Sequence, residues 1–222
     1  MRFTAALAVI AAAAAAPAAQ AASVEIRDAV ARVTVVPEDR SDIKVEVTHP
    51  NAQLPLTVST SGDHAVIDGG LRHRIRSCNG ISRNARIRVH GGGEVKEADL
   101  PQVVVYTPRS VEVQANGAVQ GAIGRTSSLE LHDSGCSAWT VADVAGDARV
   151  HSSGAGQVRM GQAGRLDIHL SGAADIHATR VREALDASLS GAGNVRIDEV
   201  GGQMDARVSG VGSIRVDAGQ DT

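Results

Sequence analysis

The chain has 222 residues, a formal net charge of −3 at pH 7, and only one Phe, one Tyr and one Trp. The mild acidity argues against a nucleic-acid-binding protein, which would carry a basic face. So few aromatic residues do not fit the wide core of an ordinary globular domain of this length. The 24 glycines against 6 prolines favour tight turns over disorder. The composition therefore indicates a narrow structure with a thin aliphatic interior.

Residues 1–21 have the organisation of a secretory signal peptide. Met1-Arg2 supplies a positive start, and an apolar run from Phe3 to Ala16 follows. Ala19-Gln20-Ala21 then places small residues where a signal peptidase reads them, which predicts cleavage after Ala21. The alternative is an uncleaved N-terminal anchor. The apolar run is not followed by a cysteine, so a lipoprotein anchor is not indicated. We expect an exported protein of the periplasm or surface of a bacterium, and not an integral membrane protein.

Residues 22–110 alternate between apolar and polar side chains over short stretches, as half-buried strands do. The segments are 24–27, 31–35, 43–47, 56–58 and 65–67, and a Val-rich segment runs from Val103 to Pro108. An apolar period near 3.6 is not found after the leader, so almost no helix is expected. This part also lacks the repeat described below. We expect an irregular set of strands that caps the repeats.

An acid-free segment between Gly69 and Gly93 carries six arginines and two histidines. In an extended chain the first three arginines would point the same way, and so would the last two. One interpretation is a cationic patch for the phosphates or acidic sugars of the cell envelope, because guanidinium groups offer forked donors to such anions. The alternative is a set of solvated faces that pair with acids elsewhere. The candidate binding residues are Arg72, Arg74, Arg76, Arg83, Arg86 and Arg88.

Residues 111–216 repeat one pattern six times, a small polar residue followed by glycine. The glycines are 18 or 19 residues apart, and apolar residues lie four and six positions before each of them and, in most copies, four and six positions after. A fixed period combined with an apolar spacing of two is typical of a β-solenoid. Charged residues five positions before and after the glycine should face solvent. Residues 217–222 are expected to form a C-terminal tail. The glycines are Gly117, Gly135, Gly154, Gly172, Gly191 and Gly210.

The repeats and the segments before them resemble a known family. Ser171–Ile176 and Ser190–Val195 both read Ser-Gly-Ala-Gly/Ala-Asn/Asp-Val/Ile, and the likeness is strongest at Ser190–Ile197. Together with the Val-rich segment that ends in Pro108, they are similar to the family called putative auto-transporter adhesin, head GIN domain, over roughly residues 24–216. The resemblance implies a right-handed parallel β-helix in the bacterial envelope. It implies no defined reaction and supplies no catalytic residues.

Two cysteines and three histidines are the remaining candidates for a bond or a metal site. Cys78 and Cys136 could form a disulfide in an exported protein, or remain unlinked thiols, with Cys136 in a small core position that Ala fills in other repeats. His132, His151 and His169 each lie three positions before a glycine, so they should stack on one face. Stacked imidazoles could share a metal ion or simply form a polar outer face. A zinc site also requires a carboxylate or thiolate, and the sequence does not show one.

Enzyme signatures in the sequence are weak, and we assign no catalytic residue and no cofactor. Gly135–Trp139 resembles a thiol-protease segment only faintly, and Ser41 and Lys44 have a serine–lysine spacing in a strand region rather than on a helix. The favoured hypothesis is a non-catalytic envelope protein, adhesin-like or a scaffold, that binds an anionic polymer, a surface or a protein partner. The alternative is a carbohydrate-active β-helix enzyme of the lyase or hydrolase type. The sequence leaves the oligomeric state open.

Overall fold

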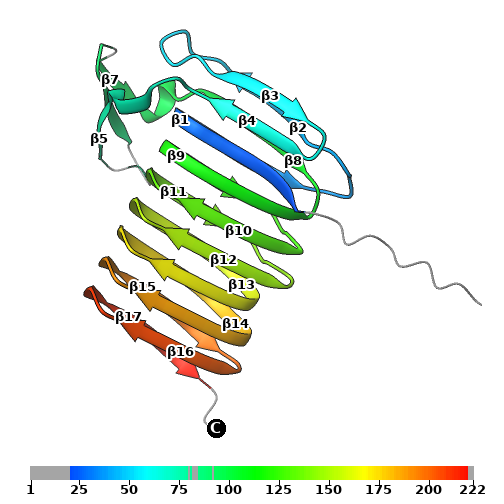
Figure 1. The fold of residues 1–222 in the computed structure, drawn as a ribbon, viewed down its shortest axis with the longest axis vertical. Coiled ribbons are helices and arrows are strands. Elements are labelled where there is room, and N and C mark those ends of the chain that lie inside the picture. The colour runs from blue at the N-terminus through cyan, green and yellow to red at the C-terminus, as the bar shows by residue number, and fades with distance from the viewer. Residues whose placement is uncertain (1–20, 80, 82–84, 92, 220–222) are drawn as a thin grey trace, which may run out of the picture.

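The protein is a parallel β-solenoid of about six turns (Figure 1). This computed structural model describes residues 21–79, 81, 85–91 and 93–219, with only the backbone of residues 78 and 79. The predicted signal peptide, except for Ala21, and Gln220, Asp221 and Thr222 lie outside the described residues. Within the described part of the chain we find no α-helix, and no helical segment has the length and hydrophobicity needed to span a bilayer.

Each turn has two long sides, one before and one after the repeated glycine. The bounds of the strands are β1 Ala22–Pro37, β2 Lys44–His49, β3 Thr57–Ser61, β4 His64–Asp68, β5 Ile75–Asn79, β6 Arg86–Val89, β7 Gly93–Lys96, β8 Gln102–Thr107, β9 Ser110–Ile123, β10 Ser128–Asp133, β11 Cys136–Val141, β12 Asp147–Ser152, β13 Ala155–Leu170, β14 Ala173–Leu189, β15 Ala192–Val200, β16 Gln203–Val208 and β17 Val211–Gly219. Of these, β1, β9, β13 and β14 are long enough to run along both sides. Two turns of 3-10 helix, η1 Arg72–Arg74 and η2 Glu97–Asp99, complete the set.

Equivalent residues of successive repeats lie directly above one another. On the side before the glycine, Leu131 of β10 pairs with Val113 of β9 and with Val150 of β12. On the side after it, Val158 of β13 lies between Trp139 of β11 and Ile176 of β14 in the same way. All of these pairings are parallel, so each repeat forms one turn of the solenoid. This register confirms the predicted fold class.

The interior is the column of aliphatic residues that the spacing predicts. Val113, Leu131, Val150 and Ile168 are fully buried, and Trp139 is the largest side chain among the residues with almost no exposure. The last turn differs, because Met204, Val208 and Val211 are 55%, 47% and 82% exposed. No described strand pairs with β16 and β17 on their outer edge, so the inward residues of this turn are covered from one side only.

The repeated glycine is required by the close stacking of the turns at one corner. A Cβ atom added to any of five glycines would lie 2.0–2.3 Å from the carbonyl oxygen of the equivalent glycine one turn earlier. Real side chains do not approach backbone oxygen so closely, so the corner accepts only glycine. Clearance between successive turns therefore explains why glycine recurs at this corner. These glycines are Gly135, Gly154, Gly172, Gly191 and Gly210.

The N-terminal strands continue the stack and then cover it. β1 pairs in parallel with β9 from Ala22 to Val35, with one irregularity between Ile26 and Ala29, and it also pairs with β4 and β8. β2 and β3 then add antiparallel strands to β8 and β4. A turn of solenoid shape therefore precedes the first repeat, although its sequence lacks the 18–19-residue period. The division of the chain at residue 110 stays a prediction.

Candidate functional site

The basic segment forms a small sheet that packs on the solenoid. β5, β6 and β7 pair in antiparallel fashion, separately from the main sheet (Figure 1). Ile87, Val89 and Val95 from this sheet form a second apolar cluster with Val30 of β1 and Ala118 of β9. The exposed side chains of β6 are its alternate residues, Arg86 and Arg88. Burial of one face of the sheet thus directs the arginines of β6 to the surface.

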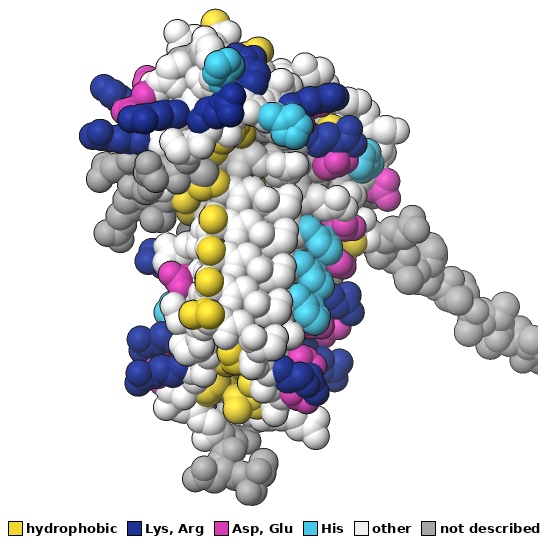
Figure 2. All heavy atoms as spheres, turned by 60° about the vertical axis from the view of Figure 1, so that its left-hand side comes forward, with side chains coloured by type: hydrophobic (Ala, Val, Ile, Leu, Met, Phe, Trp, Pro, Cys, Tyr) yellow, Lys and Arg dark blue, Asp and Glu magenta, His cyan; other side chains and the backbone are white. Residues whose placement is uncertain are grey.

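The first three arginines do not share an extended strand. Arg72–Arg74 is a turn of 3-10 helix in which Arg72 has a φ of 21°, and β5 begins only at Ile75. The expectation that Arg72, Arg74 and Arg76 point the same way along a strand was therefore wrong. The chain has to turn here because Leu71 is buried in the cluster beneath the small sheet. Lys and Arg side chains nevertheless gather at this end of the molecule (Figure 2).

The arginines of the segment differ in their contacts. Arg74 donates from Nε to the carbonyl oxygen of His90 over 3.1 Å, and Arg88 lies 3.7 Å from a carboxylate oxygen of Glu94. Arg72, Arg76 and Arg86 make no ion pair with any described residue. Arg83 lies outside the described residues. Among the described residues Arg88 therefore has an acidic partner, and the role of the segment as a cationic patch stays a prediction.

A cleft separates the small sheet from the solenoid side that follows the glycines. One part, of about 420 Å³, is lined by residues of β1, β9, β11 and β13, and an adjoining part of about 660 Å³ by the ends of β6 and β7. Arg32 and Glu97 line both parts. Volumes of this size are typical of ligand sites. The first part presents mostly polar side chains, namely Arg32, Thr34, Glu97, Gln120, Thr140, Gln157 and Arg159.

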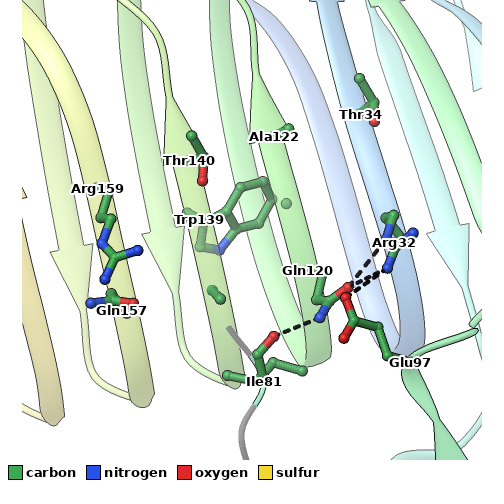
Figure 3. Close-up of a pocket in the computed structure, with 12 residues that line it drawn as sticks. Arg32, Thr34, Ile81, Glu97, Gln120, Ala122, Trp139, Thr140, Gln157 and Arg159 are labelled. Carbon is green, nitrogen blue, oxygen red and sulfur yellow. Dashed lines mark hydrogen bonds and ion pairs between the residues drawn. The ribbon is translucent and has the colours of Figure 1, made fainter. Parts of the chain in front are cut away.

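Arg32 lies where the two parts of the cleft adjoin. Its Nε donates to Oε1 of Gln120 over 3.1 Å, and its Nη2 donates to Oε1 of Glu97 over 3.0 Å. The Nε2 of Gln120 in turn donates to the carbonyl oxygen of Ile81 over 2.7 Å. Figure 3 shows the side chains of Arg32, Gln120 and Glu97 pointing toward one another, with Arg159 and Gln157 of β13 beyond Trp139 of β11. The network ties β1 and β9 to the segment that carries the small sheet.

Cations dominate the rest of the cleft. Arg86 and Lys96 are direct cross-strand neighbours on β6 and β7, and both line the second part. Like charges placed opposite each other across a sheet destabilise it. Lys96 and Arg159, like Arg86, make no ion pair with a described residue. Of the described residues that line the cleft, Glu97 is the one carboxylate, and it is paired with Arg32.

Sequence reasoning found Arg86 and missed its neighbours in the cleft. Arg32 alternates with buried residues of β1, so its exposure could be read from the sequence, but its partners could not. Lys96 follows the acid-free segment and was not included in it. Arg159 was assigned to an outward column, which the structure bears out.

The three histidines stack on the outer face of the other long side. Their ring centroids are 4.7 Å apart for His132 and His151 and 5.0 Å for His151 and His169, with the rings nearly parallel. His132 and His169 lie 2.8 and 3.1 Å from carboxylate oxygens of Glu130 and Asp167. Burial together with the two neighbouring histidines lowers the pKa of His151, the middle imidazole of the three. A column of histidine beside the corner of the solenoid is visible in Figure 2.

Cys136 is disulfide-bonded, whereas the side chain of Cys78 lies outside the described residues. The pairing of Cys78 with Cys136 therefore stays a prediction. The core position expected for Cys136 was wrong. Its side chain is partly exposed, and Ser137, the next residue, is the buried one. The reason is the alternation of β11, in which Trp139 and Val141 also point inward.

Fold and surface together define an all-β parallel solenoid protein with a polar, mostly cationic cleft at its N-terminal end. A family profile described as "Putative auto-transporter adhesin, head GIN domain" matches residues 98–219, and the chain belongs to this family. The match includes every repeat and the strand β8 before them.

A crystal structure titled as a putative cell adhesion protein from Clostridium sporogenes is also similar. The alignment covers 91% of this chain and 94% of that one, at 8% sequence identity and a TM-score of 0.29. The comparison with curated proteins gave no match.

Proposed function

We propose that this protein is a non-catalytic, exported cell-envelope protein that binds an anionic polymer in the cleft between the small sheet and the solenoid. The description of its family contains the word adhesin, which supports a binding role. The disulfide at Cys136 supports an oxidising compartment outside the cytosol. The polymer would be an acidic polysaccharide or the phosphate-bearing sugar of an envelope lipid.

The observation that carries the proposal is the juxtaposition of Arg86 and Lys96. Several arginines elsewhere on the solenoid have acidic partners, such as Arg180 with Glu199 at 2.9 Å and Arg165 with Glu183 at 3.3 Å. At the cleft two cations face each other across a strand pair instead. A carboxylate or phosphate bound between them would remove their repulsion and accept their hydrogen bonds.

The polar residues near these cations suit a sugar chain. Gln120, Gln157, Thr34 and Thr140 offer amide and hydroxyl groups along the solenoid side of the cleft (Figure 3). Sugars present hydroxyl groups that donate and accept hydrogen bonds, and such groups match amide and hydroxyl side chains. Cations in one part of the cleft and neutral polar groups in the other together favour an acidic polysaccharide over a simple anion.

The experiment is retention on immobilised polygalacturonate, with neutral dextran as the reference matrix. The double variant Arg86→Gln and Lys96→Gln should lose most of the retention shown by the wild-type protein. The matched control, Arg165→Gln and Arg180→Gln, removes the same charge from residues that have acidic partners and should be retained like the wild type. Retention should fall steeply as salt is added, because exposed charges are screened over about 8–10 Å at physiological ionic strength.

Two outcomes would contradict the proposal. Equal losses for the two double variants would mean that net charge, and not the cleft, governs retention. Release of new reducing ends from the polymer would favour the enzyme alternative. The hydrolase form of that alternative requires a pair of carboxylates in the cleft, whereas the described lining residues contribute only Glu97.

A further inference from the structure

The histidine column has a carboxylate within reach. Glu130, His132 and His151 each offer one ligand atom, and these three atoms lie within 4.8 Å of one another. The carboxylate oxygen of Glu130 is 2.8 Å from Nε2 of His132. Sequence reasoning left a zinc site without its acidic ligand, and the alternation of β10 supplies it from two residues earlier on the same strand.

From this geometry we propose that Glu130, His132 and His151 form a site for a divalent transition-metal ion of the zinc, nickel or copper type. Two imidazoles and one carboxylate suit these ions, whereas calcium and magnesium prefer oxygen ligands alone. Three protein ligands with one position left for water is the arrangement of an open zinc site.

The backbone holds the ligands in register while the side chains keep freedom to close on an ion. His132 and His151 are directly paired residues of β10 and β12, so the spacing of the strands fixes the distance between their Cα atoms. The side chains of Glu130 and His132 are 36% and 40% exposed. Ligand atoms around zinc lie about 2.0–2.2 Å from the ion. Small rotations of the three side chains therefore have to bring the ligand atoms to that distance from a common ion.

Space and charge around the three ligands also favour a cation. A hollow of about 250 Å³ between the histidine column and the serines of the corner leaves the rings open to solvent. Asp167 on the next strand adds a second carboxylate, which lies beside His169. Arg149 disfavours a bound cation, because its Nη1 lies 3.8 Å from Oε2 of Glu130, the carboxylate oxygen that does not contact His132. Arg149 is thus a competitor for the carboxylate that the metal would use.

The column ends after three turns, which limits where the ion can bind. The residues at the equivalent position on either side are Gln114 and Ser188. Neither side chain is an imidazole, so a continuous metal-binding face along the solenoid is not available. The assignment to His132 and His151, rather than to His151 and His169, rests on the ligand atoms of the first pair and Glu130 lying within 4.8 Å of one another.

The test is calorimetric titration of the tag-free, chelator-treated protein with ZnCl2, accompanied by thermal melting. We expect one zinc ion per chain and a melting temperature that rises with zinc concentration, because the ion binds the folded state. His132→Gln and His151→Gln should each weaken zinc binding by more than about tenfold. Arg149→Gln should strengthen it.

His177→Gln is the matched control. His177 is also a half-exposed histidine paired with a carboxylate, at 2.8 Å from Asp198, but another imidazole does not stack on it. The His177→Gln variant should bind zinc with the same affinity as the wild-type protein. Three results would overturn the proposal. The first is the absence of saturable zinc binding at 1 mM ZnCl2, which is about a thousand times a micromolar dissociation constant. The others are a loss of zinc affinity in His177→Gln equal to that in His132→Gln, or a loss of zinc affinity that is confined to His169→Gln.

Discussion

Gly121 and Trp139 provide the sharpest test of the interior packing. They are paired residues of β9 and β11, with Val33 and Val158 above and below them in the same column. The indole lies over Gly121, so a Cβ atom there would lie 2.0 Å from Cε3 and Cζ3 of the ring. Trp139 is 1% exposed. Gly121→Ala should therefore displace the ring or the strand.

The size of the effect follows from the required movement. Carbon atoms that are not bonded pack at about 3.5–4.0 Å, so the ring and the new methyl group have to separate by about 1.5–2 Å. Overpacking a core usually destabilises a protein by about 1–3 kcal/mol. Because the clash here is severe, we expect Gly121→Ala to cost about 3 kcal/mol of stability. Trp139→Leu empties part of the space and should cost about 2 kcal/mol. In the double variant the leucine leaves room for the methyl group, so the two costs should not add.

The assay is urea denaturation followed by far-UV circular dichroism, with the fluorescence of the one tryptophan as a second signal. We expect a favourable coupling of about 1–2 kcal/mol between the two substitutions. Gly219→Ala is the control, because a Cβ there meets no atom within 4 Å. A coupling energy near zero would refute the placement of the indole over Gly121.

Two further predictions concern the solenoid interior. Ile176→Asp should destabilise the protein by about 4 kcal/mol or more, because it buries an unpaired carboxylate. His177→Asn changes the next residue, which faces outward, and should cost at most about 1 kcal/mol. Equal urea midpoints for the two variants would contradict the assignment of inward and outward residues. Burial raises the pKa of Asp133, whose carboxylate accepts a hydrogen bond from Ser137. A raised folded-state pKa means that stability is fully present below the unfolded pKa of about 3.9 and is lost as the pH rises through the folded value. The Asp133→Asn variant should therefore gain stability relative to the wild type as the pH rises from about 4, and a difference that does not change with pH would contradict this.

The repeat determined most of the solenoid by itself. Side chains of a strand alternate with a period of two, and parallel turns stack equivalent residues at the strand spacing. A residue's offset from its glycine therefore predicts both its face and its neighbours. For this reason the inward position of Val113, Leu131 and Val150 and the stacking of His132 on His151 could be predicted without the structure. Glycine at position 121, where other repeats carry a larger apolar residue, has its explanation in the tryptophan of the next turn.

Only the tertiary structure decided how the basic segment meets the solenoid. The small sheet packs through apolar residues that have no period, so its placement depends on the fit of one surface to another. That fit brings Arg86 and Lys96 to Arg32, which comes from a distant part of the chain. The contact of Glu130 with His132 depends on both the sequence pattern and the tertiary structure, because strand alternation places the two residues on one face and side-chain rotamers bring the carboxylate to the ring. Periodicity assigns a residue to a face, but contacts between faces depend on side-chain packing in three dimensions.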